Sequence, residues 1–399
     1  MPKISQTGQH IPASPIRKLV PYAESAKRRG IHVYHLNIGQ PDIPTPEEAL
    51  AAIRAVDVRT IAYTHSAGIG SYREALARFY TDRGLPLTDE QVIVTTGGSE
   101  AILMALLATC DRGDQIIVPE PYYANYNGFA TEAGVEIVPV RSYIEEDFAL
   151  PSIAEFERLI TPKTRGILIC NPNNPTGYLY SEAEIRQLRE IVLRHDLFLI
   201  ADEVYSDFCY DGAQHHSVLT LEGVDDHVIM VDSISKRFSM CGTRIGALVS
   251  RNAAVIDAAL RMGQARLCAP YIEQLAAEAA LHTPKSYFTT VHDEYQARRN
   301  FMIDALNRMP GVRCPMPRGA FYAIAELPVD DADRFAQWML EEFEHQGRTV
   351  MVAPASGFYA DPATGRHQVR LAYVLNIDDL RAAMETLAVA LQTYPGRTR

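Results

Sequence analysis

The sequence predicts an α/β protein with a large domain, whose mostly parallel sheet is covered by helices on both faces, and a smaller α+β domain. Between about residues 70 and 282, short apolar runs alternate with helical patterns, as in sheets buried on both faces. These runs end in polar or glycine-rich segments, which is where such sheets bind ligands. After residue 284 the alternation gives way to a long helical pattern and a few short strands.

The first 60 residues predict two helices and one short strand. The helices span residues 16–29 and 46–56, and the strand spans residues 33–38. Gly39 and three following prolines end the strand, because neither residue type continues a regular strand easily. Pro46 suits the first turn of the second helix, where its missing N–H has no intrahelical partner.

Seven apolar runs predict the strands of the large sheet, at residues 91–96, 115–118, 135–140, 165–170, 197–200, 228–231 and 245–250. The helical patterns lie at residues 72–83, 97–110, 123–132, 152–160 and 181–195. The last of these starts like a capping box, with Ser181 three residues before Glu184.

The remaining sequence predicts helices at residues 284–309, 331–345 and 377–391 and strands at residues 320–325 and 368–372. Because the large sheet is already complete without the N-terminal residues, we expect those residues to pack with this smaller unit. The expected large domain therefore spans residues 50–283, and the small domain combines residues 1–49 with 284–399.

Composition excludes several classes of partner. The 399 residues carry a net charge of −11, which disfavours nucleic acid. Neither a membrane-spanning run of roughly 20 apolar residues nor an apolar signal core is present, so we expect a cytoplasmic protein without membrane contact. The six cysteines form no Cys-x-x-Cys pair, which predicts thiols of a reducing compartment and no metal site.

Ser233-Ile234-Ser235-Lys236 follows a buried apolar run and precedes Arg244 by eight residues. Burying a lysine is costly unless it has a partner or a covalent role. One such role is a Schiff base with a cofactor aldehyde, and nearby hydroxyls and an arginine suit a phosphate. Taken alone, the segment is equally compatible with an exposed loop lysine.

Three further segments follow predicted strands. Gly97-Gly98-Ser99-Glu100 opens a helix and could attract an anion, although an ordinary tight turn explains it better by itself. Asn174 lies in a turn rich in proline and could direct its amide into a site, but the plain turn is again favoured. Asp202, with Tyr205 three residues later, either caps the backbone or keeps a pyridine nitrogen protonated.

Arg370 lies between apolar residues of a predicted strand in the smaller domain. One interpretation is an edge charge that blocks aggregation, and for an isolated arginine this is favoured. The other is a bidentate clamp for a substrate carboxylate.

Together these segments resemble the class I aminotransferases of fold type I, the pyridoxal-phosphate family that includes aspartate aminotransferases. The resemblance runs from Leu36 to Arg370 and rests most on Asn-Asn-Pro-Thr-Gly and on Ser-x-Ser-Lys with its later arginine. It implies that Lys236 is the Schiff-base lysine and proton shuttle and that Asp202 is the partner of the pyridinium. It also implies that Tyr205 and Asn174 donate hydrogen bonds to the ring oxygen.

The resemblance further implies a phosphate cup made by Gly98, Ser99, Ser233 and Arg244, with Glu100 adjacent. These residues come from the start of a helix and from the lysine motif.

In the same comparison, Tyr123 takes the place of the aromatic side chain that stacks on the cofactor ring, where many relatives have tryptophan. Gly39 and Arg370 resemble the elements that receive the α-carboxylate of the substrate. Tyr63 resembles a tyrosine that reaches the phosphate of a neighbouring subunit, which implies a homodimer with shared sites.

The resemblance implies transfer of an amino group from an L-amino acid to a 2-oxo acid by a ping-pong mechanism, with an aspartate or aromatic donor. Arg17 and Arg266 are candidates for reading a side-chain carboxylate. Tyr63, Tyr122 and Tyr126 could instead line a pocket for aromatic donors.

Two other functions stay open. A carbon–sulfur lyase or related elimination enzyme of the same fold keeps the same cofactor residues. A cofactor-sensing regulatory module requires an added DNA-binding segment, and only about 30 residues precede the first strand. A dinucleotide-dependent oxidoreductase is disfavoured, because the spaced glycine fingerprint is missing.

Overall fold

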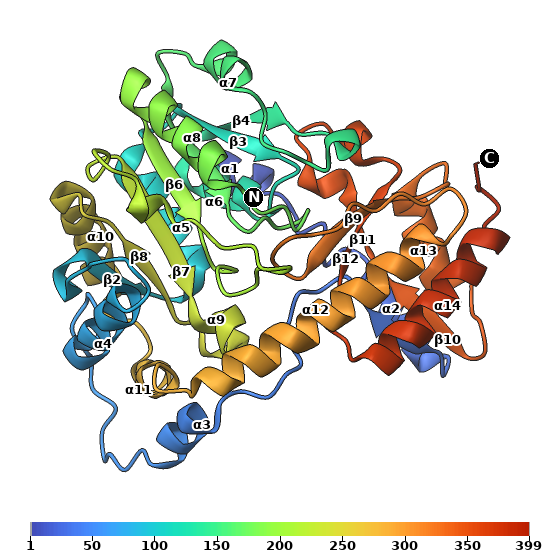
Figure 1. The fold of residues 1–399 in the computed structure, drawn as a ribbon, viewed down its shortest axis with the longest axis horizontal. Coiled ribbons are helices and arrows are strands. Elements are labelled where there is room, and N and C mark those ends of the chain that lie inside the picture. The colour runs from blue at the N-terminus through green and yellow to red at the C-terminus, as the bar shows by residue number, and fades with distance from the viewer. Residues whose placement is uncertain (1, 399) are drawn as a thin grey trace.

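The computed structural model describes residues 2–398 and confirms the predicted α/β fold (Figure 1). A seven-stranded sheet has the order β2-β8-β7-β6-β5-β3-β4. Strand β8 pairs antiparallel with β2 and with β7, and the other pairs of described strands in this sheet are parallel. The strands are β2 (Val92–Thr95), β3 (Gln115–Glu120), β4 (Glu136–Arg141), β5 (Thr164–Cys170), β6 (Phe198–Asp202), β7 (Val228–Ser233) and β8 (Gly246–Val249).

Both faces of this sheet are buried, as the continuous apolar runs predict. In β5, Ile167 and Ile169 belong to one buried cluster, whereas Leu168 and Cys170 belong to the other. Helices α5 (Gly97–Thr109), α6 (Tyr126–Ala133) and α10 (Ala253–Arg266) cover one face. Helices α4 (Gly70–Thr81), α7 (Ile153–Leu159), α8 (Glu182–His195) and α11 (Tyr271–Ala280) cover the other.

Local sequence signals set several helix boundaries. Ser181 and Glu184 form the predicted capping box at the start of α8, where the Ser181 N–H donates to Glu184 Oε2 over 2.7 Å. The sequence did not predict α10, α11 or the short α1 (Gln6–His10). The start of α10 carries a clear signal nevertheless, because Asn252 Oδ1 accepts from the Ala254 and Val255 N–H groups.

The smaller unit contains two short sheets. The antiparallel sheet has the order β11 (Ala353–Pro354), β12 (Gln368–Ala372) and β9 (Tyr322–Glu326). The N-terminal β1 (His32–His35) pairs in parallel with β10 (Arg348–Met351), although more than 300 residues separate them. Helices α2 (Val20–Arg28), α13 (Ala332–Glu341) and α14 (Ile377–Thr393) pack around these strands.

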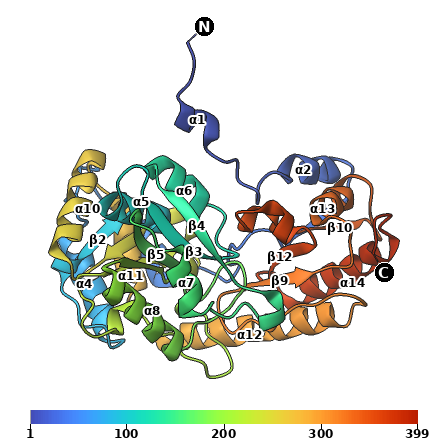
Figure 2. The ribbon, with the colours of Figure 1, turned by 90° about the horizontal axis from the view of Figure 1, so that it is seen from above.

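Helix α12 (Lys285–Asn307) joins the two units and runs along the molecule from one to the other (Figures 1 and 2). With 23 residues it is about 35 Å long. Helix α3 (Glu47–Arg54) packs on α11, beside the large sheet. Helix α1 projects at the top of Figure 2 and contacts α6.

Candidate active site

A cavity of about 520 Å³ lies at the carboxyl ends of the parallel strands, between the large sheet and the smaller unit. This is the position where open α/β sheets bind ligands. The residues singled out from the sequence that line it are Gly39, Gly98, Ser99, Tyr123, Asn174, Asp202, Tyr205, Ser233, Lys236, Arg244 and Arg370. Arg17 and Tyr126 line it as well, whereas Glu100, Tyr63, Tyr122 and Arg266 do not belong to its lining.

Lys236 reaches this cavity from α9 (Ile234–Arg237), which directly follows β7. Its side chain is half-buried, and Nζ donates a 2.9 Å hydrogen bond to the carbonyl oxygen of Gly39. Nζ also lies 3.6 Å from the sulfur of Cys241. The amine is therefore held in the cavity rather than on an exposed loop, and its contacts are neutral groups.

Asp202 ends β6 and is 7% exposed. Its Oδ2 accepts a 2.8 Å hydrogen bond from the Tyr126 hydroxyl, while its Oδ1 is buried without a hydrogen-bond partner. Burial raises the pKa of the Asp202 carboxyl to about 6, and the hydrogen bond from Tyr126 partly opposes this increase. A buried carboxylate oxygen without a partner can accept a hydrogen bond from a cationic N–H group.

Tyr126 was not assigned a role toward Asp202 in the sequence analysis. It lies at the start of α6, and burial raises the pKa of its phenol well above the ordinary value, so it remains a donor. Tyr123, on the preceding turn, packs edge-to-face on Tyr126 with ring centroids 5.5 Å apart. No local sequence pattern connects Tyr126 with Asp202, which is 76 residues away.

The start of α5 has free backbone N–H groups of the kind that attract anions. Its first N–H groups have no intrahelical partners and lie beside the Ser99 and Ser233 side chains on the cavity wall. Gly97 has a φ of +76°, and a Cβ at this position would collide with the guanidinium of Arg244. Arg244 itself adopts a left-handed φ of +56°, a strained conformation of the kind that clusters at functional sites.

Glu100 lies behind this anion site. Its Oε2 accepts a 2.6 Å hydrogen bond from the Thr96 N–H and pairs with the guanidinium of Arg266. Arg266 also donates to the carbonyl oxygens of Ser66 and Val94. The structure therefore gives Glu100 and Arg266 a supporting position outside the cavity.

Arg370 is 1% exposed and belongs to β12, the central strand of its sheet, so it is not an edge charge. Nη1 donates to Asn174 Oδ1 over 3.0 Å, and Nη2 donates to the carbonyl oxygen of Asn37 over 2.5 Å. Nε is buried and has no partner. Among residues 2–398, no carboxylate forms an ion pair with this guanidinium. Burial lowers the pKa of Arg370. A carboxylate ligand would give this buried guanidinium the acidic partner that it lacks.

Tyr322 closes the cavity from β9 and was missed in the sequence analysis. Its hydroxyl lies 3.0 Å from the Tyr205 hydroxyl, and its ring lies 4.6 Å from the guanidinium carbon of Arg370. A Cβ at Gly39 would overlap the Tyr322 side chain, so glycine lets the backbone pass close to Tyr322.

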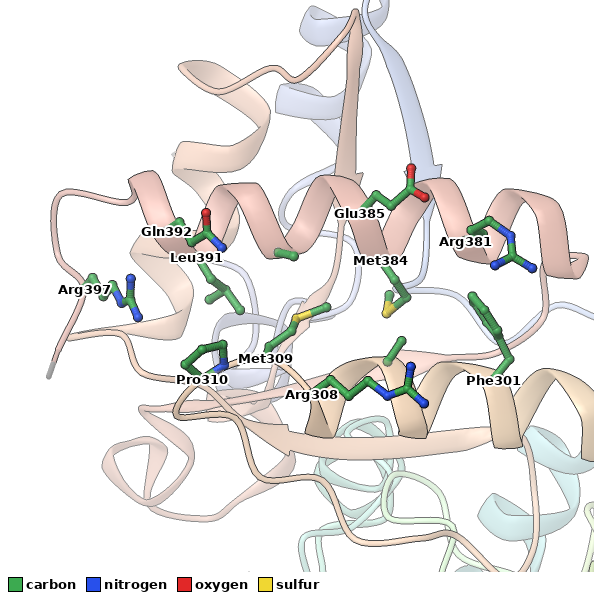
Figure 3. Close-up of a pocket in the computed structure, with 12 residues that line it drawn as sticks. Phe301, Arg308, Met309, Pro310, Arg381, Met384, Glu385, Leu391, Gln392 and Arg397 are labelled. Carbon is green, nitrogen blue, oxygen red and sulfur yellow. The ribbon is translucent and has the colours of Figure 1, made fainter.

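Another groove, of about 360 Å³, lies between α12 and α14 (Figure 3). Apolar side chains form much of it, among them Phe301, Met309 and Met384, and arginines lie at its rim. It does not combine a carboxylate, a lysine and phosphate-binding groups as the first cavity does.

Among residues 2–398, every helix is too short or too polar to cross a lipid bilayer. The same residues contain no cluster of three or more His, Cys, Asp or Glu side chains that could hold a metal ion.

Comparisons with known proteins agree with this geometry. A family model described as aminotransferase class I and II matches residues 31–387. The aspartate aminotransferase of Musicola paradisiaca is 31% identical over 375 residues, covering 92% of this chain and 91% of that protein. The aromatic-amino-acid aminotransferase 2 of Thermococcus litoralis is 31% identical over 387 residues, covering 95% and 96%. The solved aspartate aminotransferase of Thermus thermophilus with maleate has a TM-score of 0.88 at 31% identity, covering 98% of this chain and all of that one.

Proposed function

We propose that this chain, which belongs to the class I and II aminotransferase family, moves an amino group from an L-amino acid to a 2-oxo acid. Members of this family depend on pyridoxal phosphate. The transfer proceeds in two alternating half-reactions, and Lys236 is the covalent anchor of the cofactor. One observation carries the proposal. The buried guanidinium of Arg370 lacks an acidic partner in the cavity that also holds Lys236 and Asp202. A carboxylic acid substrate supplies the missing charge.

The residues of the cavity fit the cofactor. The unpartnered Oδ1 of Asp202 suits a protonated ring nitrogen, and the start of α5 with Ser233 and Arg244 suits the phosphate. Lys236 supplies the amine that bonds to the aldehyde carbon. When bound, pyridoxal phosphate withdraws electrons from the α-carbon of the substrate and makes its proton acidic.

The remaining groups orient and protect the reacting atoms. Tyr126 holds Asp202 in place, and Tyr322 lies beside the Tyr205 hydroxyl, which would donate to the ring oxygen of the cofactor. Tyr123 would pack on the face of that ring. Because each of these side chains is fixed by a neighbour, little reorganisation is needed during the reaction.

Lys236 moves the proton. Once its bond to the cofactor is exchanged for that of the substrate amine, Nζ would be free to remove the proton of the α-carbon and to return it. In the substrate-free protein the Gly39 carbonyl oxygen and the Cys241 sulfur hold Nζ within the cavity. Arg370, Asn174 and the Gly39 backbone then position the α-carboxylate.

Aspartate or aromatic donors are supported by the similar proteins, whose names include both activities. The cavity wall also offers both kinds of contact. Ile102 and Phe129 provide apolar surface, and Arg17 provides a cation.

A homodimer is part of the proposal. Ile61, Tyr63 and Leu267 are 62%, 78% and 49% exposed, and the Ser66 hydroxyl donates to the Leu267 carbonyl oxygen, which places the two segments side by side. Exposed apolar surface of this kind is typical of interfaces. Helix α1 has no buried residue and is too short to be stable alone in water. A second copy of the chain would cover these surfaces and bring Tyr63 to the neighbouring phosphate.

Two domains and a cytoplasmic location are also proposed. The pairing of β1 with β10 and the packing of α2 on α13 support a small domain built from both ends of the chain. The proposed boundary near residue 50 is best moved ahead of Glu47, because α3 packs on α11. Six free cysteines suit a reducing compartment.

The test is a set of single-turnover reactions between the purified enzyme with its cofactor and a panel of L-amino acids, without any 2-oxo acid. Amino transfer converts the cofactor to its amino form and releases one 2-oxo acid for each site. Addition of 2-oxoglutarate then restores the original absorbance.

Continuous release of ammonia and pyruvate, with the original absorbance retained, would instead show an elimination enzyme. Absence of any reaction across the panel would refute the proposed activity.

A further inference from the structure

Arg17 is a cation in the lining of the cavity, and it has no role in the proposed reaction as described above. It lies between Ser14 and α2, on an N-terminal segment that lines the cavity through Ser14, Ile16 and Arg17. Its side chain is exposed, and among residues 2–398 no side-chain hydrogen bond or ion pair holds it. The neighbouring Lys18, by contrast, pairs with Asp333 on the surface of the small domain.

The backbone around Arg17 is nevertheless fixed. The Arg17 N–H donates to the Ser14 carbonyl oxygen over 3.1 Å, and the Arg17 carbonyl oxygen accepts from Val20 over 3.0 Å. The adjacent Ile16 side chain packs on the buried cluster that includes Ile324 and Phe358. The guanidinium thus extends from an anchored backbone, which limits the entropy lost when it binds a ligand.

Asn37 links this segment to Arg370. Its Nδ2 donates to the Ile16 carbonyl oxygen over 3.4 Å, and its own carbonyl oxygen accepts from Nη2 of Arg370. Arg17 therefore belongs to the same end of the cavity as the proposed receiver of the α-carboxylate.

One cation of the cavity has no assigned partner. Its lining contains four cations, Arg17, Lys236, Arg244 and Arg370, and one carboxylate, Asp202. Under the proposed function, the phosphate satisfies Arg244, the α-carboxylate satisfies Arg370, and Lys236 bonds to the cofactor. Arg17 remains, so a second anionic group on the substrate matches it.

We propose that Arg17 is the specificity-determining residue that binds the side-chain carboxylate of a dicarboxylic amino acid and of its 2-oxo acid. This inference rests on the proposed aminotransferase function and deepens it. Aromatic donors, which carry only the α-carboxylate, gain nothing from this contact.

The test compares Arg17→Gln, Arg17→Lys and the wild type in single turnovers with aspartate, glutamate and phenylalanine. A single turnover is needed because 2-oxoglutarate, the usual acceptor, is itself a dicarboxylate. We expect Arg17→Gln to lower the second-order rate constant of the single turnover by about 10- to 100-fold for aspartate or glutamate, because a hydrogen bond to a charged group is lost. The value for phenylalanine should remain within about twofold, and Arg17→Lys should recover part of the loss.

Lys18→Gln is the matched control, because it removes a neighbouring cation that is already paired away from the cavity. It should leave all three donors unchanged. A second measurement uses calorimetry on the enzyme with its cofactor to compare succinate with butyrate, which lacks one carboxylate. We expect the preference for succinate to fall by about 10-fold or more in Arg17→Gln only.

Unchanged donor and succinate preferences in Arg17→Gln would overturn the role of Arg17 while leaving the aminotransferase function intact. Wild-type enzyme that transfers amino groups only from phenylalanine would also overturn it. Failure of every donor to react, with normal cofactor content, would refute the proposed function itself.

Discussion

Glu203 offers a test of how strongly the interior behind the cavity disfavours charge. It directly follows Asp202, is 2% exposed, and accepts hydrogen bonds from Ser217 Oγ over 3.0 Å and from the Val218 N–H over 2.9 Å. Burial raises the pKa of the Glu203 carboxyl to about 8. His215 Nε2 lies 3.5 Å from Glu203 Oε2, but burial lowers the pKa of His215 to about 4, so both are neutral at pH 7 rather than an ion pair.

The substitution Glu203→Gln replaces the neutral acid with an amide of the same shape. In the wild type, Glu203 ionises near pH 4.5 when unfolded and near pH 8 when folded. The folded state therefore binds more protons between these values, and the free energy of unfolding falls by about 1.36 kcal/mol for each pH unit. His215 contributes the opposite slope between about pH 4 and 6.5, since its folded pKa lies below its unfolded one.

Subtracting the unfolding free energy of Glu203→Gln from that of the wild type cancels the pH dependence that His215 and every other group contribute to both proteins. From pH 5 to pH 8, we expect the wild type to lose about 4 kcal/mol of unfolding free energy relative to the variant. Urea unfolding followed by circular dichroism at pH 5, 6, 7 and 8 measures this difference. Glu222→Gln, at an exposed position without an ion pair, is the control and should show no pH-dependent difference. A constant difference between wild type and Glu203→Gln would refute the argument, because Glu203 would then be ionised throughout.

Three other substitutions test the cavity. Lys236→Ala should abolish the cofactor adduct that borohydride fixes to the chain, and a stable adduct in this variant, found by mass spectrometry, would show that another residue is the anchor. Arg370→Ala should lower the rate constant per substrate concentration by about 10²- to 10³-fold while cofactor content stays normal, because two charge-assisted hydrogen bonds to the α-carboxylate are lost. Unchanged single-turnover kinetics would exclude the clamp. Tyr126→Phe removes a donor that lowers the pKa of Asp202, so that pKa should rise above about 6 and the acidic limb of the pH–activity profile should move to higher pH. A stationary limb, together with normal cofactor affinity, would assign Tyr126 a packing role only.

Much of the architecture could be predicted because its signals are local. Each of the seven strands of the large sheet is an apolar run that ends at a turn, and Ser181 with Glu184 fixes the start of α8. Helix α10 has only a weak periodic pattern, whereas α11 is as periodic as the predicted α4 and was nevertheless overlooked. Both faces of the sheet still needed covering, which argues for helices in that region.

The cavity was predicted only in part, since its contacts join distant positions. Lys236 and Asp202 stand at the ends of predicted strands, so the parallel sheet brings them together. Tyr126 and Tyr322 act through partners 76 and 117 residues away, and no local pattern reveals such pairs. For Arg370, the sequence alone was compatible with a charge on an edge strand. The structure excludes this, because Arg370 lies on β12, the central strand of its sheet.

The contact of Arg370 with Asn37 spans 333 residues and has a consequence for synthesis on the ribosome. A nascent chain that has emerged as far as residue 283 already holds every strand of the seven-stranded sheet, yet β1 still lacks β10 and Asn37 still lacks its guanidinium. Such long-range contacts form late, because closing a long loop is entropically costly. The smaller unit is therefore completed only after residue 370 has been made, and until then β1 and Asn37 lack the partners that they have in the folded protein.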